Sequence, residues 1–195
     1  MAIILASKSP RRQELLRLLG LDFTIMTEDV DEHMDPALPP AGEVARVSEK
    51  KAAAVLPQVA PEDLVVCADT IVVLGGEIMG KPKDASDACR MLQRLSGRAH
   101  MVYTAVTVCC HGRSTTRVEA TQVHFRALSE REIRAYVASG EPMDKAGAYG
   151  IQGRASVFVT GIEGDYFNVM GLPVCMLTGM LRDYGISILE EDRNP

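Results

Sequence analysis

Apolar residues gather in short runs separated by polar, glycine-containing and proline-containing segments, a pattern typical of alternating strands and helices. Three such runs predict a buried strand at residues 2–6, a second strand at 21–27 and an apolar strand at 64–68. Leucines spaced as a helical stripe predict a helix over 10–19. Ser9 is expected to cap this helix, Pro10 suits its first position, and Gly20 is expected to end it.

The remaining elements follow from the same pattern. The apolar run at 64–68 leads into Asp69 and Thr70 and continues at 71–74, after which Gly75-Gly76 predicts a hairpin turn. The other segments are predicted as loops at 28–40, 80–82 and 140–153, as helices at 43–56, 84–95, 129–139 and 173–184, and as strands at 101–110, 117–128 and 156–160. This order of elements predicts an α/β protein, with a mixed sheet on which helices pack.

Composition narrows the class of protein. The chain has 195 residues, of which 47% are hydrophobic and 24% charged, which argues for one globular domain and against disorder. With 21 basic and 26 acidic side chains, the net charge of −5 argues against a dedicated nucleic-acid-binding protein, but it leaves room for a local anion pocket. The beginning lacks the pattern of a signal peptide, and no run reaches about 18 apolar residues. The expectation is a cytoplasmic protein that does not bind membranes.

Hydroxyl and cationic side chains gather where the first predicted strand meets the first predicted helix. Residues 7–12 read Ser-Lys-Ser-Pro-Arg-Arg, and a helix N-terminus presents N–H groups that bind anions. Cations at this end of a helix oppose its dipole, so a bound phosphate would explain their presence. The alternative is an ordinary capped helix with solvated basic side chains.

Two further segments carry candidate chemistry. Asp69 stands at the end of an apolar run, where open α/β sheets place ligands, and a carboxylate there suits a divalent metal or a general base. The loop 141–153 is polar and rich in glycine, with Lys145 suited to a phosphate and Gln152 to the edge of a base. The alternatives are a turn residue and a plain surface loop. Taken singly, several other charged side chains are expected to be solvated: Asp31, Glu32, Lys50, Lys51 and Lys81.

Six motifs follow one another in order between residue 3 and about residue 184, which is nearly the whole chain. They are Ser7-x-Ser9-Pro10-Arg11-Arg12-x-Glu14-Leu15-Leu16, Ala68-Asp69-Thr70-Ile71-Val72, Gly80-Lys81-Pro82, Leu95-Ser96-Gly97-Arg98-x-His100, Glu141-Pro142-x-Asp144-Lys145-Ala146-Gly147-x-Tyr149-Gly150-Ile151-Gln152-Gly153 and Gly164-Asp165-Tyr166-x-Asn168-Val169-x-Gly171-Leu172-Pro173. In this combination the chain resembles the Maf family of nucleoside triphosphate pyrophosphatases. Its loop from Asp144 to Gly153 looks like that of the branch acting on dTTP and UTP.

The resemblance implies one domain over residues 1–195, with an elongated mixed sheet in two lobes around a cleft, as in inosine-triphosphate pyrophosphatases. It implies a homodimer that hydrolyses dTTP and UTP to the monophosphate and pyrophosphate with Mg²⁺ or Mn²⁺. The residues that match the family's site are the catalytic base Asp69, the specificity positions Arg11, Thr70 and Gln152, the phosphate-binding positions Ser7, Arg12, Lys51 and Lys81, and the metal-binding positions Asp69 and Glu32.

Two other classes of function stay open at this point. Maf relatives have been linked to inhibition of septum formation, so the alternative is a nucleotide-binding regulatory protein with a protein partner. A pure binder gains nothing from a carboxylate beside a triphosphate, so Asp69 favours the enzyme. The net charge of −5 and the scarcity of aromatic residues, 5 Tyr, 4 Phe and no Trp, disfavour a nucleic-acid binder.

Overall fold

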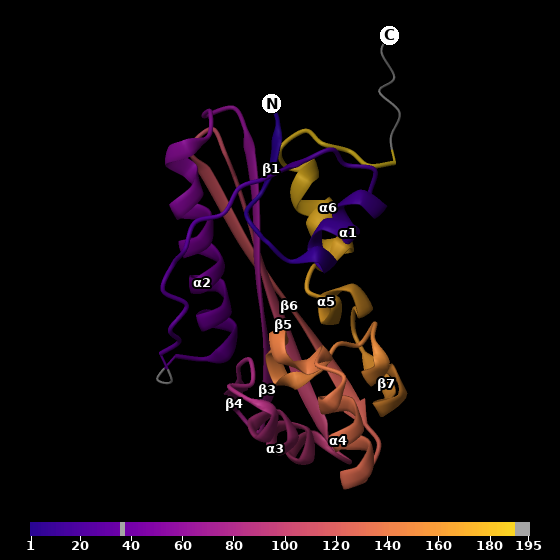
Figure 1. Ribbon diagram of the computed structural model, residues 1–195. Helices are drawn as coiled ribbons and strands as arrows, with labels where there is room; N and C mark the ends of the chain where they lie inside the picture. Colours follow the sequence, from indigo (N-terminus) through magenta and orange to yellow (C-terminus); the bar gives the residue numbers. More distant parts are fainter. Residues whose placement is uncertain (36–37, 190–195) are drawn as a thin grey trace. The chain divides into compact units, whose positions relative to one another are not determined.

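A computed structural model describes residues 1–35 and 38–189 as a mixed β-sheet with flanking helices (Figure 1). The strands are β1 (Ile3–Leu5), β2 (Thr24–Ile25), β3 (Leu64–Leu74), β4 (Glu77–Met79), β5 (Ala99–Cys110), β6 (Arg113–Phe125) and β7 (Val159–Glu163). The helices are α1 (Pro10–Leu18), α2 (Pro40–Val55), α3 (Ala85–Leu95), α4 (Glu130–Ala138), α5 (Tyr166–Met170) and α6 (Val174–Arg182). The strand order is β2-β1-β3-β5-β6-β7, with β4 paired to β3. β1 runs parallel to β2 and β3, whereas β4 and β7 pair antiparallel with β3 and β6, which confirms the predicted fold class.

The chain divides into two compact units. The first comprises Met1–Asp69, Thr104–Glu119 and Gly171–Pro195, and the second comprises Thr70–Tyr103 and Ala120–Met170. The long strands β3, β5 and β6 therefore contribute residues to both units. The prediction of one domain over residues 1–195 includes positions 36–37 and 190–195, which lie outside the described residues, as does part of the predicted loop 28–40.

The first unit has a core between α2 and the sheet. Buried apolar side chains of β1, β3, α2 and β5 form one cluster: Ile4, Ala6, Ala52, Val55, Val65, Cys67 and Cys109. Successive side chains of a strand alternate between its faces, so Val65, Cys67 and Asp69 lie on the face of β3 that meets α2. On α2, the helical spacing puts Lys51 beside Val47 and Val55. A lysine and an aspartate are therefore placed at the edge of one apolar interface.

The second unit has an aromatic core. His100 of β5 makes edge-to-face contacts with Phe125 and Tyr149, and Phe158 makes them with Phe125 and Tyr136. All five side chains are buried. Such edge-to-face pairs stabilise a core by about 0.5–1.5 kcal/mol beyond the area they bury. The cluster ties β5, β6 and α4 to the loop that follows α4.

Several local predictions are confirmed. Leu74 pairs with Glu77, so Gly75-Gly76 forms the turn of the β3–β4 hairpin. Ser129 and Glu132 form the predicted capping box at the start of α4. In the described part of the chain, 1–35 and 38–189, no helix has the length and the apolar character that crossing a membrane requires.

Other predictions of secondary structure are wrong in their details. The strand predicted over 21–27 is reduced to Thr24–Ile25, both exposed, because this edge strand pairs with β1 over two residues only. The strand predicted over 156–160 begins at Val159, after a 3₁₀ turn over Arg154–Phe158. The helix predicted over 43–56 already begins at Pro40, since proline suits a first helical turn, where its missing N–H is not needed. Helix α5 was not predicted.

Two predicted roles near the N-terminus and in β3 also need correction. Ser9 stands at the N-cap position of α1, but its side chain makes no capping hydrogen bond. Instead its N–H donates to Ser7 Oγ at 3.3 Å. Asp69 does not end a strand, because β3 runs without a break from Leu64 to Leu74. Asp69 is thus a buried carboxylate within a strand, a placement that requires a charged or hydrogen-bonding partner.

Candidate functional site

The centre of the candidate site is an ion pair between α2 and β3. Lys51 Nζ lies 2.6 Å from Asp69 Oδ1, and the two side chains are only 17% and 10% exposed. The same ammonium lies 2.8 Å from Glu32 Oε1, on the loop before α2. Three predicted site residues from three segments of the first unit therefore meet at one ammonium group.

The loop that carries Glu32 is held against α2 by Glu43, a buried acid of that helix. Glu43 is fully buried, and its carboxylate accepts a hydrogen bond from the Asp35 N–H at 2.6 Å and from Arg46 at 2.8 and 2.7 Å. Arg46 in turn donates to the His33 carbonyl at 2.6 Å. The hydrogen bond with Arg46 is the main cause that lowers the pKa of Glu43 to about 2, against the opposing effect of burial. The backbone just after Glu32 is thus fixed to the helix that carries Lys51.

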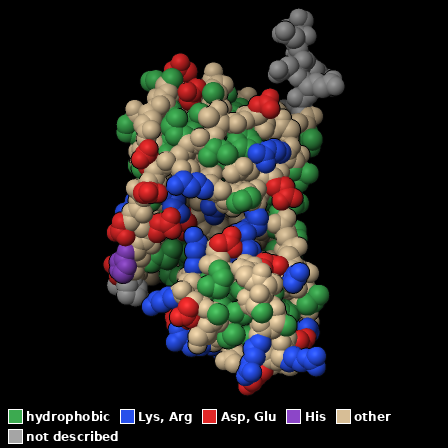
Figure 2. Space-filling model, in the orientation of Figure 1, with side chains coloured by type: hydrophobic (Ala, Val, Ile, Leu, Met, Phe, Trp, Pro, Cys, Tyr) green, Lys and Arg blue, Asp and Glu red, His purple; other side chains and the backbone are tan. Residues whose placement is uncertain are grey.

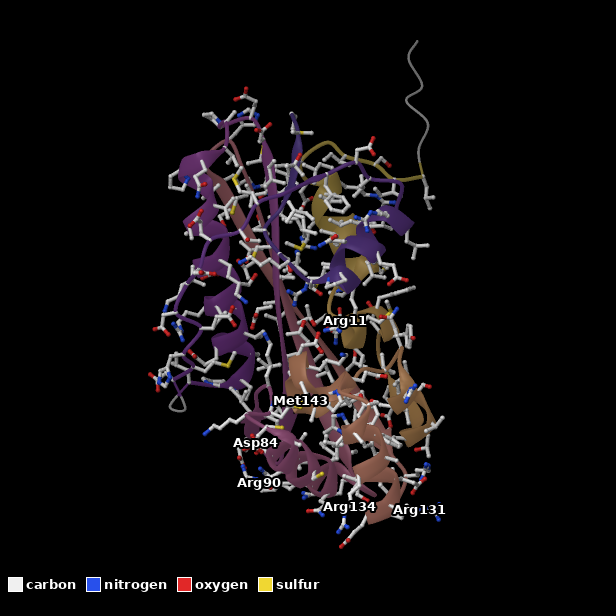
Figure 3. All side chains as sticks on the ribbon, in the orientation of Figure 1. Arg11, Asp84, Arg90, Arg131, Arg134 and Met143 are labelled. Carbon is white, nitrogen blue, oxygen red and sulfur yellow. The ribbon has the colours of Figure 1, made fainter. Side chains whose placement is uncertain are left out.

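Arg12, in the first turn of α1, is the second cation of the candidate site in the first unit. Arg12 Nε donates to the Gly171 carbonyl at 2.7 Å, and Arg12 Nη1 donates to Ser7 Oγ at 3.2 Å. Ser7 is buried two residues after the end of β1, so the hydroxyl and the guanidinium are both held in place. Arg11 lies in the same first turn of α1 and is labelled in Figure 3.

Burial and charge act against each other at these cations. Burial lowers the pKa of Lys51, but the adjacent carboxylates of Asp69 and Glu32 outweigh it and raise the pKa above its ordinary value. Burial also lowers the pKa of Arg12, while the attraction of Asp69 acts in the opposite direction. The raised pKa keeps Lys51 protonated at neutral pH. Arginine stays protonated in proteins, so Arg12 is charged as well. Burial raises the pKa of the Cys67 thiol to about 11, so this neighbour is a neutral core residue rather than a nucleophile.

The donor set also fits a divalent cation. The carboxylates of Asp69 and Glu32 each contact the Lys51 ammonium through one oxygen, so the two carboxylates lie close to each other in the first unit. Oxygen ligands suit Mg²⁺ and Mn²⁺, and Mg²⁺ is commonly held by one or two carboxylates together with phosphates and water. Among the residues that the structure describes, no group of three or more His, Cys, Asp and Glu side chains is placed to hold a metal ion. The protein itself therefore offers two carboxylates.

The remaining predicted residues belong to the second unit. Thr70 is half-buried in β3, whereas Lys81 and Gln152 are exposed on loops. The Gly147 N–H donates to the Gly80 carbonyl at 3.0 Å, which joins the loop that carries Gln152 to the loop that carries Lys81. A Cβ at Gly147 would lie 2.9 Å from Val72, on the face of β3 that Thr70 shares. The second unit thus ties together the segments that bear its three predicted residues.

Sequence reasoning missed the residues that hold these loops. Glu43 and Arg46 occupy the first two turns of a helix that begins at two prolines, and their spacing of three is a signal for an ion pair. Lys50 and Lys51 were expected to be alike, yet Lys50 is exposed and Lys51 half-buried. The helical period separates them, because Lys51 falls on the apolar stripe and Lys50 does not.

Comparison with known proteins shows the family to which the chain belongs. The family model described as Maf-like protein matches residues 2–184. The dTTP/UTP pyrophosphatase of Pelotomaculum thermopropionicum is 50% identical over 189 residues, 96% of this chain and 98% of that protein. The dTTP/UTP pyrophosphatase of Symbiobacterium thermophilum is 50% identical over 186 residues, 95% of each chain. Among solved structures, the Staphylococcus aureus Ham1 protein has a TM-score of 0.43 at 12% identity, covering 64% of this chain and 72% of that one. The chain belongs to the Maf family.

Proposed function

We propose that this protein is a nucleoside triphosphate pyrophosphatase that hydrolyses dTTP and UTP to the monophosphate and pyrophosphate. The observation that carries the proposal is the buried Lys51–Asp69 contact, in a chain that is half identical to proteins named dTTP/UTP pyrophosphatase. These relatives are named as enzymes, so the regulatory alternative gains no support from them.

In the proposed mechanism, Asp69 orients or deprotonates the water that attacks the α-phosphorus, and pyrophosphate leaves. A carboxylate is a weak base, so the contribution of Asp69 depends on how it is positioned against the water. Lys51 holds one carboxylate oxygen at 2.6 Å and thereby fixes its direction. Lys51 and Arg12 also supply positive charge for the phosphates, since arginine and lysine donate to phosphate oxygens.

A divalent cation completes this proposal. Asp69 and Glu32 would hold it, and it would lower the pKa of the attacking water and offset charge on the leaving pyrophosphate. The position of Glu32 suits it to bind the cation, because the backbone that follows it is hydrogen-bonded to Glu43 and Arg46.

We assign Ser7 and Lys81 to the phosphates and Arg11, Thr70 and Gln152 to specificity, with Gln152 reading the pyrimidine edge through its amide. The homodimer and the cytoplasmic location stay predictions.

The test is an assay of pyrophosphate and monophosphate release from a panel of nucleoside triphosphates with Mg²⁺ or Mn²⁺. The proposal expects strong turnover of dTTP and UTP, with pyrophosphate as the product. Preference for a purine nucleotide would contradict the assignment to the branch that acts on dTTP and UTP, but it would agree with the pyrophosphatase reaction. Binding without turnover of any nucleotide would contradict the proposed enzymatic activity and favour the regulatory alternative.

A further inference from the structure

In the second unit, the loop over residues 141–153, which carries the proposed specificity residue Gln152, is held by hydrogen bonds to one carboxylate. Glu141 begins this loop, and its Oε1 accepts a hydrogen bond from the Tyr136 hydroxyl at 3.0 Å. Its Oε2 accepts a hydrogen bond from the Arg154 N–H at 3.1 Å. The Tyr136 hydroxyl in turn accepts one from the Gly150 N–H at 3.3 Å. The carboxylate and the phenol thus hold the backbone two residues before and two residues after Gln152.

Close packing shows how tightly the loop follows this carboxylate. A Cβ at Gly153 would lie 2.0 Å from Glu141 Oε1, and a Cβ at Gly150 would lie 2.8 Å from Lys145 Cε. Lys145 Nζ donates to the Glu141 carbonyl at 2.5 Å and lies 2.6 Å from the Asp144 carboxylate. The two glycines on either side of Ile151-Gln152 are therefore the places where the backbone approaches the side chains of Glu141 and Lys145.

The protonation state of the phenol supports this arrangement. Tyr136 is buried, and burial, followed by the nearby Glu141 carboxylate, raises the pKa of its hydroxyl. The hydroxyl therefore keeps its proton and donates it to Glu141, while its lone pairs accept the Gly150 N–H. Hydrogen bonds to a charged acceptor are about twice as strong as neutral ones, which suits a loop that must keep one shape.

We propose that Glu141 is a positioning residue for substrate selection, which fixes the backbone on both sides of Gln152 so that the Gln152 amide meets the base in one orientation. This inference rests on the proposed function, in which Gln152 reads the pyrimidine. Glu141 itself does not contact the nucleotide in this account. Its effect on selectivity therefore passes through Gln152.

The test is a double-mutant cycle with Glu141→Gln and Gln152→Ala, read as the ratio of kcat/KM for dTTP to kcat/KM for dGTP. Glutamine keeps the size of Glu141 but has one acceptor oxygen, so one of the two hydrogen bonds is lost. In the wild-type background Glu141→Gln is expected to lower the ratio about tenfold, the size of one hydrogen bond to a charged group. In the Gln152→Ala background it is expected to change the ratio less than about twofold, because coupled residues are not additive.

Two further variants complete the experiment. Tyr136→Phe removes the hydroxyl that joins Glu141 to Gly150, and it is expected to lower the same ratio; it keeps the inference testable if Glu141→Gln does not fold. Glu130→Gln is the control, because Glu130 is an exposed acid at the start of α4 that pairs with Arg134. It is expected to leave the ratio unchanged.

The outcomes separate the inference from the proposed function. An unchanged ratio in Glu141→Gln and Tyr136→Phe, or an equal loss with and without Gln152, would overturn the positioning role while the enzyme stands. A wild-type protein that releases no pyrophosphate from any nucleotide would overturn both. A lower melting temperature with an unchanged ratio would show that Glu141 only stabilises the fold.

Discussion

At the scale of single residues, the site is built from charges that are buried in contact with opposite charges. Lys51 is the clearest case, because its ammonium joins Asp69 and Glu32 while most of its side chain is covered. Removing one partner of such a pair leaves a charge without compensation, which costs more than the pair itself contributes. Lys50 is the next residue and is exposed, so it provides a matched control.

We predict that Lys51→Met lowers kcat/KM for dTTP by about 100-fold or more, the usual effect of removing a positioned charge or donor. Methionine keeps the unbranched chain, so the packing of this position of α2 against β3 changes little. Steady-state kinetics beside Lys50→Met, which is expected to stay within about twofold, checks this. Equal effects of the two substitutions would contradict the assignment of Lys51.

His100 allows a prediction about pH. It is 2% exposed, Nε2 lies 2.8 Å from the Tyr149 hydroxyl, and Nδ1 has no hydrogen-bond partner among the described residues. Burial is the main cause that lowers its pKa from 6.5 to about 4. The unfolded chain therefore takes up a proton near pH 6.5 that the folded protein refuses, and stability falls as the pH drops from about 6.5 toward 4.

Substitution of His100 by glutamine should reduce this dependence. Urea unfolding of His100→Gln between pH 7 and 5 is expected to show a shallower fall in the free energy of unfolding than the wild type. A control with His111→Gln, on the exposed turn between β5 and β6, should keep the wild-type slope. If the two variants and the wild type share one slope, His100 does not act as a buried neutral base.

At the scale of elements, α2 organises the first unit's site. Along this one helix, Glu43 holds the Asp35 N–H, Arg46 holds the His33 carbonyl, and Lys51 holds the Glu32 carboxylate. The acidic loop therefore follows the helix instead of extending into solvent. Figure 1 shows the segment before α2 running beside that helix.

We predict that Glu43→Gln lowers the melting temperature by roughly 5 °C and also raises the Mn²⁺ or Mg²⁺ concentration needed for half-maximal activity. The reason is that glutamine loses the negative charge that pairs with Arg46 and the second acceptor oxygen, Oε1, which receives the Arg46 Nε–H. Glu49→Gln changes an exposed acid on the same helix and is the control. Wild-type metal dependence in a destabilised Glu43→Gln would restrict Glu43 to a structural role.

Features that depend on residues close together in the sequence were predicted correctly. Features that depend on contacts between separate elements were not. The capping box at Ser129 and the Gly75-Gly76 turn depend on residues a few positions apart, and both are present. The length of β2 depends on its pairing with β1, and the continuity of β3 through Asp69 depends on Lys51 of another element. No local pattern in the sequence contains that information.

The same division applies to the site. The resemblance supplied Asp69, Lys51 and Arg12, and the structure brings them together with Ser7 and Glu32 in one unit. Glu43 and Glu141 were not foreseen as holders of loops, because their hydrogen bonds go to backbone groups of segments whose course only the fold determines. A buried acid on an apolar helix stripe, as at Glu43, is the signal that was available.

At the scale of the whole molecule, acidic and basic side chains are interspersed, and the residues that the structure describes show no broad basic surface on the face in view (Figure 2). The net charge is −5, and Figure 2 shows acidic and basic side chains mixed on the face in view. Arg90, Arg131 and Arg134 lie at the end formed by α3 and α4 (Figure 3), and Arg90 and Arg134 pair with acids of their own helices. An anionic substrate is therefore expected to be drawn to Arg12 and Lys51 rather than to a broad basic surface.

The division of the chain into two units falls at the proposed catalytic position. The first unit ends its first segment at Asp69, and the second begins at Thr70, so β3 carries the proposed base and a proposed specificity residue side by side in sequence. Alternation along the strand points the two side chains to opposite faces.

The most direct test of the account is pyrophosphate release from dTTP by the wild type and by Asp69→Asn, with folding of both checked by circular dichroism. Asparagine keeps the size of Asp69 but removes the negative charge that meets Lys51 and would act on water. The account predicts a folded variant whose rate falls by about 10²–10⁴, the range for loss of a positioned base. A folded Asp69→Asn protein that loses less than about tenfold would contradict the assignment of Asp69 as the catalytic base.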